Sequence, residues 1–323
     1  MGDVAMTVPV VHSLAVQYPQ LRITMLTHKR LVPFFSWMPD NVQTIGLDIK
    51  AYKGLAGLNR LYAEIMPLGC DAVADIHDVI RTKYLRLRFS LSGRKVAVID
   101  KGRKEKKRLL GNAIHSDALI PMTERYRKVF LQLGLPFELS FDHICPTVEE
   151  LSQIAVSDSY NIGIAPFAAH QGKVYPLEKM KRVVDLLAED KCHVYLFGAG
   201  KEEKAILESW ERDGVESVSG KMGGLKNELL LMSKLDVMLS MDSSNMHMAA
   251  MMGTRCVSVW GATHPKAGFV AWKQPLDSII QKEFPCRPCS IYGNKPCKMG
   301  DFCCMNSISP EEIVEKIRNG RTD

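Results

Sequence analysis

The amino-acid sequence predicts an α/β protein of two domains, each built around a parallel β-sheet. Three observations predict this fold class. The chain has 323 residues, more than a single hydrophobic core usually holds. Short β-rich runs alternate with longer helical stretches, which is the pattern of repeated βα units. A polar stretch at residues 146–160 interrupts this alternation. We therefore expect one domain over residues 1–155 and a second over residues 156–323.

The first half of the chain contains four expected strands, at residues 21–26, 41–47, 72–75 and 95–99. Helical stretches lie between them, and Pro9 favours a further helix at 9–17 because proline fits the first helical turn. A doubly wound domain normally begins with a central strand that ends in a glycine loop before this helix. Here Gly2 and Asp3 lead almost directly into the helix. The first strand is therefore missing from the pattern, because of truncation, a start codon assigned too late, or a sheet completed in another way.

The second half continues the alternation more regularly. Its expected strands are residues 161–165, 193–197, 237–240 and 256–260. Between them, apolar residues recur at spacings of three and four, as in amphipathic helices, over residues 177–189, 201–210 and 227–234.

Composition is that of an ordinary globular protein, with 46% hydrophobic and 24% charged residues. No apolar run reaches the ~18 residues of a membrane span, and the N-terminus lacks the features of a signal peptide. We therefore expect a cytoplasmic protein. The net charge of +6 is uneven: residues 1–155 hold 21 basic and 15 acidic side chains, and the remainder holds 21 of each. The first half is the part suited to an anionic partner.

Five loops are candidate ligand sites, because open α/β sheets bind ligands beyond the carboxyl ends of their strands. They contain Asp3, Lys173, the acids Glu202 and Glu203, the polar run 242–247, and residues 260–265. Each also has a structural explanation. Asp3 could cap a helix, Lys173 could be a surface lysine, and the two glutamates could be first-turn acids. The run 242–247 is the most informative, because it holds more capping side chains than one helix start can use.

Taken together, these segments resemble glycosyltransferase family 9, the bacterial heptosyltransferases that build the lipopolysaccharide core. The resemblance rests on GDVAMTVP at residues 2–9, KVYP at 173–176, DSSNMHMAA at 242–250 and WGATHP at 260–265. It implies a GT-B architecture, with two Rossmann-like domains and their parallel sheets facing a cleft. It also implies transfer of a sugar, usually heptose, from a nucleoside-diphosphate donor with inversion at the anomeric carbon. ADP-heptose is the expected donor, and no metal or other cofactor is expected in catalysis.

The resemblance also assigns roles to single residues. It implies that Asp3 is the general base and that Lys173 neutralises the leaving diphosphate. Glu202, with Glu203 as the alternative, would hold the donor ribose. Donor contacts would also come from residues that share the stretch after the strand at 237–240: Asp242, Ser244, Asn245 and His247.

A basic segment at residues 81–108 carries 12 basic and 2 acidic side chains. It has two explanations, a solvated charged face or a contact with an anionic acceptor or membrane. We favour the second and assign acceptor binding to Arg81, Lys83 and Arg86, with a lipid-linked glycan as partner and peripheral contact with the inner membrane. A nucleic-acid partner is not expected, because aromatic residues are not interleaved with the charges.

Five cysteines crowd into residues 284–305, which we call the cysteine-rich segment. Cys286, Cys289, Cys297 and Cys303, or Cys304 in place of Cys303, supply enough thiolates for a tetrahedral structural zinc. Disulfide or redox pairing and free thiols are the alternatives. Two other functions remain open for the whole chain: a nucleotide-sugar epimerase, or a non-catalytic homologue that binds a sugar nucleotide.

Overall fold

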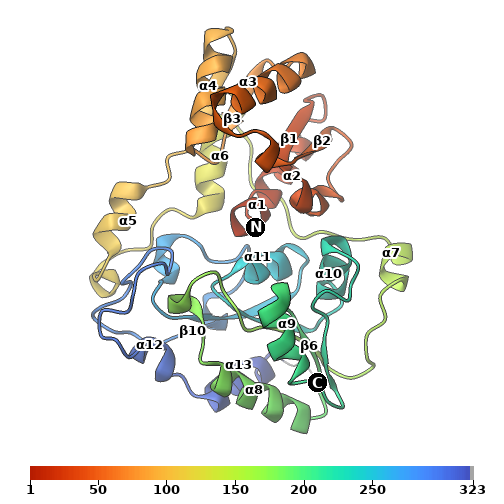
Figure 1. Ribbon diagram of the computed structural model, residues 1–323, viewed down its shortest axis with the longest axis vertical. Helices are drawn as coiled ribbons and strands as arrows, with labels where there is room; N and C mark the ends of the chain where they lie inside the picture. Colours follow the sequence, from red (N-terminus) through yellow and green to blue (C-terminus); the bar gives the residue numbers. More distant parts are fainter. Residues whose placement is uncertain (321–323) are drawn as a thin grey trace. The chain divides into compact units, whose positions relative to one another are not determined.

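The computed structural model describes residues 1–320 and divides them into two compact units (Figure 1). The larger unit comprises Met1–Met6, Lys104–Leu119 and the chain from Asp142 onward; the smaller unit comprises Thr7–Arg103 and Ile120–Phe141. Each unit therefore draws on more than one stretch of sequence. The boundary expected at residues 155 and 156 stays a prediction, and residues 321–323 of that second domain lie outside the described part.

The larger unit is built on a six-stranded parallel sheet in the order β10-β9-β8-β5-β6-β7. Its strands are β5 (Asn161–Ala165), β6 (His193–Leu196), β7 (Val215–Ser217), β8 (Val237–Met241), β9 (Arg255–Trp260) and β10 (Ile279–Gln281). The chain starts at β5, adds β6 and β7 on one side, and then crosses to add β8, β9 and β10 on the other. This is the order of a Rossmann sheet, and its topological switch point lies between β5 and β8.

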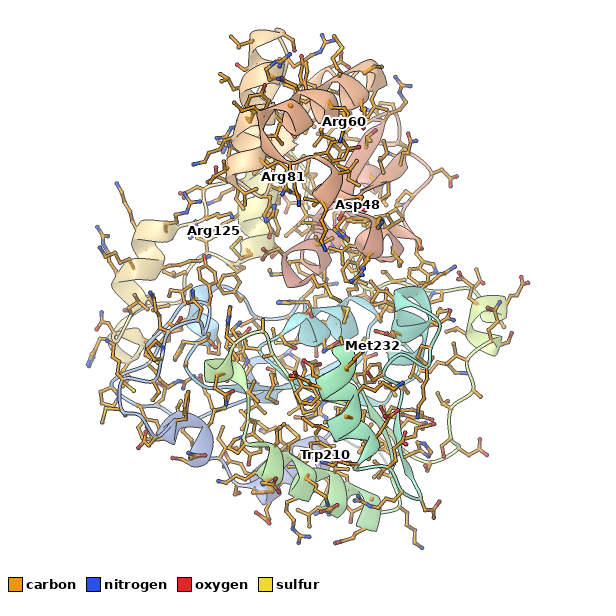
Figure 2. All side chains as sticks on the ribbon, in the orientation of Figure 1. Asp48, Arg60, Arg81, Arg125, Trp210 and Met232 are labelled. Atoms are coloured by element: carbon orange, nitrogen blue, oxygen red, sulfur yellow. The ribbon has the colours of Figure 1, made fainter. Side chains whose placement is uncertain are left out.

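The core of the larger unit lies between this sheet and its helices. Both β5 and β8 are buried along their whole length, as expected for central strands of a sheet covered on both faces. Gly163 in β5 permits close packing, since a Cβ there would lie 2.5 Å from the sulfur of Met238. Helices α8 and α13 lie side by side (Figure 1), and Trp210, labelled in Figure 2, packs in the same core.

The helices of the larger unit vary in length from one to more than three turns. They are α1 (Gly2–Ala5), α7 (Val148–Ser152), α8 (Leu177–Glu189), α9 (Gly200–Glu208), α10 (Leu225–Met232), α11 (Ser244–Met251), α12 (Cys303–Asn306), α13 (Pro310–Arg318) and most of α5 (Arg103–Leu109). Short 3₁₀ turns complete it, namely η4 (Ala113–His115), η5 (Gln171–Lys173), η6 (Pro265–Ala267) and η7 (Leu276–Ser278). Local sequence explains α13 well: Ser309 Oγ accepts a hydrogen bond from Glu312 N–H at 3.1 Å, and Pro310 occupies the first turn.

The smaller unit contains two separate parallel pairs of strands rather than one sheet. One pair is β1 (Ile23–His28) with β2 (Val42–Leu47), and the other is β3 (Ala72–Asp75) with β4 (Lys95–Val98). Its helices are α2 (Val8–Gln17), α3 (Gly54–Ile65), α4 (Ile80–Leu91) and α6 (Met122–Gln132), with 3₁₀ turns η1 (Lys29–Phe35), η2 (Ile49–Ala51) and η3 (Met66–Leu68). Within residues 1–320 no strand joins β1 to β3, in agreement with the strand missing from the sequence pattern.

Within the described residues, every helix is too short or too polar to span a lipid bilayer.

Candidate functional site

The switch point of the larger sheet brings together two residues that lie far apart in the sequence. Lys173 ends η5, in the loop after β5, and Asp242 directly follows β8. Lys173 Nζ lies 2.8 Å from Asp242 Oδ2, and the two side chains are only 17% and 6% exposed. A partly buried ion pair of this kind is placed where a Rossmann sheet binds its ligand. The sequence predicted both residues, and the structure brings them into contact.

Backbone hydrogen bonds hold the main chain on both sides of this pair. Lys173 N–H donates to the carbonyl of His170 at 3.0 Å, and Asp242 N–H donates to the carbonyl of Val259 at 3.2 Å. The hydroxyls of Ser240 and Ser243 lie 3.1 Å apart below the Asp242 loop. Both charged side chains therefore extend from fixed backbone positions.

Helix α11 begins two residues after Asp242. No side chain caps its first turn, so the N-terminal N–H groups are not satisfied by a capping side chain. An uncapped helix start at this edge of a sheet is suited to bind a phosphate, because these groups and the helix dipole favour an anion. Ser244 and Asn245 form the first turn of the helix, as the sequence indicated.

His247 lies one turn into α11 and is 7% exposed. Burial lowers the pKa of its imidazole to about 4, although the carboxylates of Asp242 and Asp3 oppose this shift. The imidazole is therefore neutral at pH 7. It offers one hydrogen-bond donor and one acceptor to a ligand rather than a fixed positive charge.

Asp3 lies in α1, which packs against α11 (Figure 1). The sequence suggested a glycine loop here, and the structure instead shows a short helix. Gly2 allows the close approach, since a Cβ on it would lie 3.3 Å from Cδ2 of His247. Asp3 is exposed and contributes to the electrostatic field at His247. The larger unit thus places Asp3 near the same cluster as Lys173 and Asp242.

The two candidate ribose acids begin α9, after β6, on the neighbouring strand to β5. Glu203 Oε2 accepts a hydrogen bond from Ala199 N–H at 2.7 Å, so it serves as a cap of its own helix. Glu202 lies exposed beside it. Of the two, Glu202 is the better placed to meet ribose hydroxyls.

The loop after β9 borders the Lys173 loop, because Ala262 N–H donates to the carbonyl of Gly172 at 2.9 Å. Arg287 is completely buried, and its guanidinium supports this loop through hydrogen bonds. It donates to the carbonyls of Gly261 at 2.6 Å and Thr263 at 2.8 Å. Sequence reasoning missed Arg287, since a single arginine among cysteines and prolines has no periodic signal.

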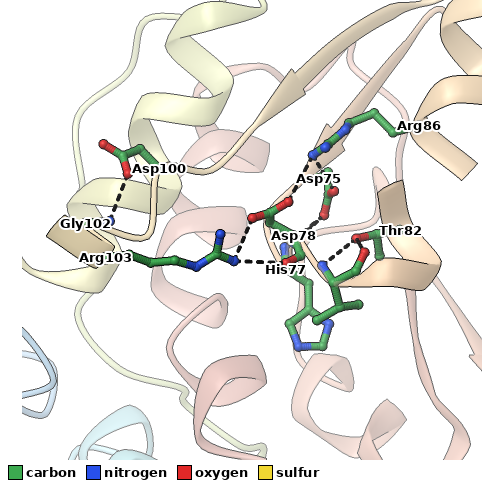
Figure 3. Close-up of polar contacts among 9 residues, drawn as sticks. Asp75, His77, Asp78, Thr82, Arg86, Asp100, Gly102 and Arg103 are labelled. Atoms are coloured by element: carbon green, nitrogen blue, oxygen red, sulfur yellow. Dashed lines mark hydrogen bonds and ion pairs between the residues drawn. The ribbon is translucent and has the colours of Figure 1, made fainter. Parts of the chain in front are cut away.

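In the smaller unit, the acceptor candidates start on α4, after β3. Arg86 is partly exposed and forms ion pairs within its own unit: its Nη1 lies 2.9 Å from Asp75 Oδ2 and 3.4 Å from Asp78 Oδ1 (Figure 3). Asp75 also accepts hydrogen bonds from the N–H groups of His77 and Asp78. The ion pairs of Arg86 therefore stabilise the loop between β3 and α4. The side chain of His77 points away from these ion pairs (Figure 3).

Arg81, labelled in Figure 2, and Lys83 lie on the first turn of α4, where Arg81 is half-buried and Lys83 is exposed. Burial raises the pKa of the Asp78 carboxyl, but the charges of Lys83, Arg103 and Arg86 outweigh burial and hold that pKa below its usual value. Arg103 Nη2 reaches Asp78 Oδ2 at 2.8 Å. The positive charges of this segment are thus partly neutralised by the buried Asp75 and the partly buried Asp78.

The cysteines of the cysteine-rich segment are all free thiols. The pKa of Cys304 is raised to about 11, mainly by burial and also by the neighbouring thiols of Cys289, Cys303 and Cys286, against the opposing charge of Arg287. Over residues 1–320 the structure groups no three His, Cys, Asp or Glu side chains in an arrangement that could hold a metal ion. The predicted set of Cys286, Cys289, Cys297 and Cys303 is therefore not brought together as zinc ligands.

Comparisons with known proteins agree with the family and the fold class that the sequence predicts. Residues 87–299 match the family model of glycosyltransferase family 9 (heptosyltransferase). Lipopolysaccharide heptosyltransferase 3 of Escherichia coli is 26% identical over 87% of this chain and 84% of its own length.

Two solved structures have the same fold. A family 9 glycosyltransferase of Veillonella parvula superimposes with a TM-score of 0.75 at 20% identity, covering 99% of this chain and 94% of that one. E. coli heptosyltransferase WaaC with ADP-2-deoxy-2-fluoro heptose gives a TM-score of 0.72 at 16% identity, covering 99% and 97%. The predicted GT-B fold class is confirmed. With two thirds of its length matched by the family model, the chain belongs to glycosyltransferase family 9, the heptosyltransferases, and is a glycosyltransferase.

Proposed function

We propose that this enzyme transfers heptose from ADP-heptose to a lipopolysaccharide core or a related cell-envelope glycan, with inversion at the anomeric carbon. The observation that carries the proposal is the cluster at the switch point, in which Lys173, Asp242 and His247 lie at the carboxyl edge of the sheet with Asp3 nearby. A relative solved with an ADP-heptose analogue supports the nucleotide and the sugar.

The diphosphate of the donor would bind between Lys173 and the start of α11. Departure of ADP develops negative charge on the leaving oxygen, and a fixed ammonium with a helix N-terminus stabilises that charge. Lys173 has three N–H donors, so it can keep its bond to Asp242 while it contacts a phosphate oxygen. This set of groups needs no metal ion for catalysis.

The remaining donor contacts follow from position. Asp242 would accept hydrogen bonds from hydroxyls of the sugar, because its carboxylate lies beside the diphosphate site. Ser244 and Asn245 present polar side chains on the first turn of α11, and neutral His247 can donate to a phosphate or sugar oxygen. Glu202 would accept from the ribose hydroxyls, since Glu203 already caps α9.

Asp3 would act as the general base that removes the proton from the acceptor hydroxyl. It is the exposed carboxylate of α1, packed on the helix that starts the proposed donor site. A positioned base of this kind contributes roughly 10²- to 10⁴-fold to the rate. In an inverting reaction the acceptor oxygen attacks the face opposite the departing diphosphate, and one base suffices.

The acceptor would be an anionic, lipid-linked glycan. Arg81, Lys83 and Arg86 of α4 would contact its negative charges, and the ion pairs of Arg86 with Asp75 and Asp78 also support the loop before α4. The basic segment at 81–108 would also favour peripheral contact with the cytoplasmic face of the inner membrane, where anionic lipids attract such segments by about 1 kcal/mol per charge.

Two variants test the proposal with ADP-heptose and a heptose-deficient lipopolysaccharide acceptor. Lys173→Ala should weaken ADP binding, measured by calorimetry, and should lower kcat/KM for the donor by about 100-fold. Asp3→Asn should leave ADP binding intact and lower kcat by at least the ~10² of a general base. Thermal unfolding of both variants shows whether they fold. A folded Lys173→Ala enzyme with unchanged donor kinetics contradicts the donor site, and an active Asp3→Asn enzyme contradicts the base.

The same assay tests the finer points. The anomeric configuration of the product, read by NMR, should be opposite to that of the donor, and activity should survive EDTA. Release of ADP without an acceptor, at the rate seen with it, would favour hydrolysis or epimerisation of the donor instead.

A further inference from the structure

The cysteine-rich segment packs directly on the loop that carries Lys173. Gly172 lies between two neighbours: a Cβ on it would come within 2.8 Å of the Cβ of Ala262 and 3.1 Å of the carbonyl oxygen of Gly293. Cys289 N–H and Ser290 N–H also donate to the carbonyl of Ala262, at 3.0 and 3.3 Å. Close backbone contacts therefore join three segments: the Lys173 loop, the loop after β9 and the cysteine-rich segment.

Gly293 is the residue of this segment that lies against Lys173 itself. Its backbone has a φ of 77°, in the left-handed region that favours glycine. A Cβ at this position would lie 2.6 Å from Cγ, 3.2 Å from Cδ and 3.1 Å from Cε of Lys173. The backbone of Gly293 therefore runs along the aliphatic stem of the lysine, leaving no room for a methyl group between them.

Lysine has a flexible four-carbon stem and gains precision only where its surroundings restrict it. On one side Asp242 fixes the ammonium of Lys173 at 2.8 Å. On the other side Gly293 confines the carbons that lead to it. The two contacts together determine the direction in which the charge points.

We propose that Gly293 is a positioning residue of the donor site, which aims the ammonium of Lys173 at the diphosphate of the nucleotide sugar. This inference rests on the proposed role of Lys173. The absence of a side chain at residue 293 is the feature that matters, because any Cβ there displaces the lysine stem. In this proposal, the cysteine-rich segment positions Lys173 through Gly293, whether or not its cysteines bind a metal.

The chain offers a matched control for a test. Gly300 lies in the same segment with a φ of 79°, and a Cβ on it would meet nothing within 4 Å. Gly293→Ala and Gly300→Ala therefore introduce similar backbone strain, but only the first pushes on Lys173. We expect both variants to lose thermal stability through backbone strain, and Gly293→Ala to lose more because its Cβ also displaces the stem of Lys173. We expect a roughly tenfold lower kcat/KM for ADP-heptose and weaker ADP binding in Gly293→Ala alone, as preorganisation of a charged contact is lost. Equal kinetics in the two folded variants would overturn the proposal.

A second pair of variants keeps the test decisive if alanine prevents folding. Asparagine tolerates the left-handed region better than alanine, so Gly293→Asn and Gly300→Asn repeat the comparison with less strain. A double-mutant cycle then separates positioning from a general structural effect. In a Lys173→Ala background, Gly293→Ala should no longer change ADP binding, because the stem that it displaces is gone. If Gly293→Ala lowers the affinity for ADP in the Lys173→Ala background as much as it does in the wild type, the positioning role is contradicted. Unchanged donor kinetics in Lys173→Ala alone would instead contradict the proposed function on which the inference rests.

Discussion

Lys173 and Asp242 meet across the switch point of the larger sheet, with Nζ and Oδ2 2.8 Å apart. They come from loops after the two central strands β5 and β8, which pair with each other in the sheet. Asp242 thus neutralises the cation that we assign to the diphosphate. The carboxylate of Asp242 holds the ammonium of Lys173 in place, and it would also compete with a phosphate for that ammonium.

Asp242→Asn should therefore affect product and donor differently. Loss of the carboxylate leaves Lys173 with its full charge for a phosphate, so the affinity for ADP should rise by about two- to fivefold, as for a partly exposed ion pair worth up to ~1 kcal/mol. Transfer from ADP-heptose should fall by about tenfold or more, because the sugar loses its acceptor group. Calorimetry with ADP and steady-state kinetics with ADP-heptose measure the two effects. Parallel losses in both would show that Asp242 is only a structural partner of the lysine.

The sequence predicted the components of this site but not their contacts. It placed Lys173, Asp242 and His247 after expected strands, and the rule that ligands bind at the carboxyl edge of a sheet nominated those loops. The ion pair depends on the strand order, which puts β5 beside β8 although the pairing partners Ala165 and Ser240 lie 75 positions apart in the sequence. That order is set by packing of the whole unit, which local patterns do not encode.

Other features were missed for similar reasons. The strands β7 and β10 have three residues each, too few for a period-two pattern. The sequence predicted a loop at Gly2 and Asp3, whereas in the structure these residues belong to helix α1, which packs against α11. Arg86 and Arg81 look alike in sequence, yet only Arg86 reaches Asp75 and Asp78. Contacts between residues far apart in the sequence show no local signal, such as those of the Arg287 side chain with the loop after β9 and of the Gly293 backbone with Lys173.

The two arginines of α4 should respond differently to substitution. Arg86→Gln breaks bonds to Asp75, whose side chain is only 3% exposed, and should lower the free energy of unfolding by about 2–4 kcal/mol because a buried carboxylate loses its partner. A double charge reversal of Arg81 and Lys83 to Glu should leave stability within about 1 kcal/mol and raise the KM for the anionic acceptor several-fold.

Denaturant unfolding and acceptor kinetics at two salt concentrations distinguish these outcomes. The acceptor KM of the wild type should rise with salt, and that of the charge-reversed variant should rise less. If donor KM rises as much as acceptor KM, the contact with the acceptor is not made by these two residues.

Arg287 and Arg255 can be compared because they lie near opposite ends of β9. Arg255 is the first residue of the strand, and Arg287 contacts the carbonyl of its last residue, Trp260. Arg287 is fully buried and donates to the carbonyl of Trp260 and to those of the following loop. Arg255 begins the strand and donates to the carbonyls of Ile317 and Lys316 at 3.2 and 2.8 Å. Both arginines therefore satisfy backbone carbonyls, and only Arg287 does so beside the Lys173 loop.

Replacing either arginine with Gln should destabilise the protein, since each unsatisfied buried carbonyl costs about 1–3 kcal/mol. Only Arg287→Gln should also raise the KM for the donor, because the loop that contacts Gly172 loses its support. Thermal unfolding and donor kinetics, measured well below the unfolding midpoint, check both statements. An equal donor KM in the two variants would limit Arg287 to a structural role.

His247 should make the stability of the enzyme sensitive to mild acid. Its pKa is lowered to about 4 by burial, whereas an unfolded histidine titrates near 6.5. The unfolded chain therefore binds a proton at a higher pH than the folded one, so the contribution to stability is complete above pH 6.5 and is lost as pH falls toward 4. A shift of this size corresponds to roughly 3 kcal/mol. The charges that face the imidazole are Asp242, Asp3, Lys173 and the chain terminus.

His247→Gln keeps a neutral polar group and removes this titration. Its free energy of unfolding at pH 7.5 should be lower than that of the wild type, because the buried site is repacked. The difference in the free energy of unfolding between wild type and variant, which we call the gap, should narrow as pH falls from 6.5 to 4.5. Only the wild type loses the proton-linked contribution of His247 over this range. Urea unfolding at half-unit steps of pH measures the gap, and the subtraction cancels the carboxyl groups common to both proteins. A gap that stays constant over this range would mean that His247 keeps its ordinary pKa in the folded protein, so that the imidazole gains its proton already near pH 6.5.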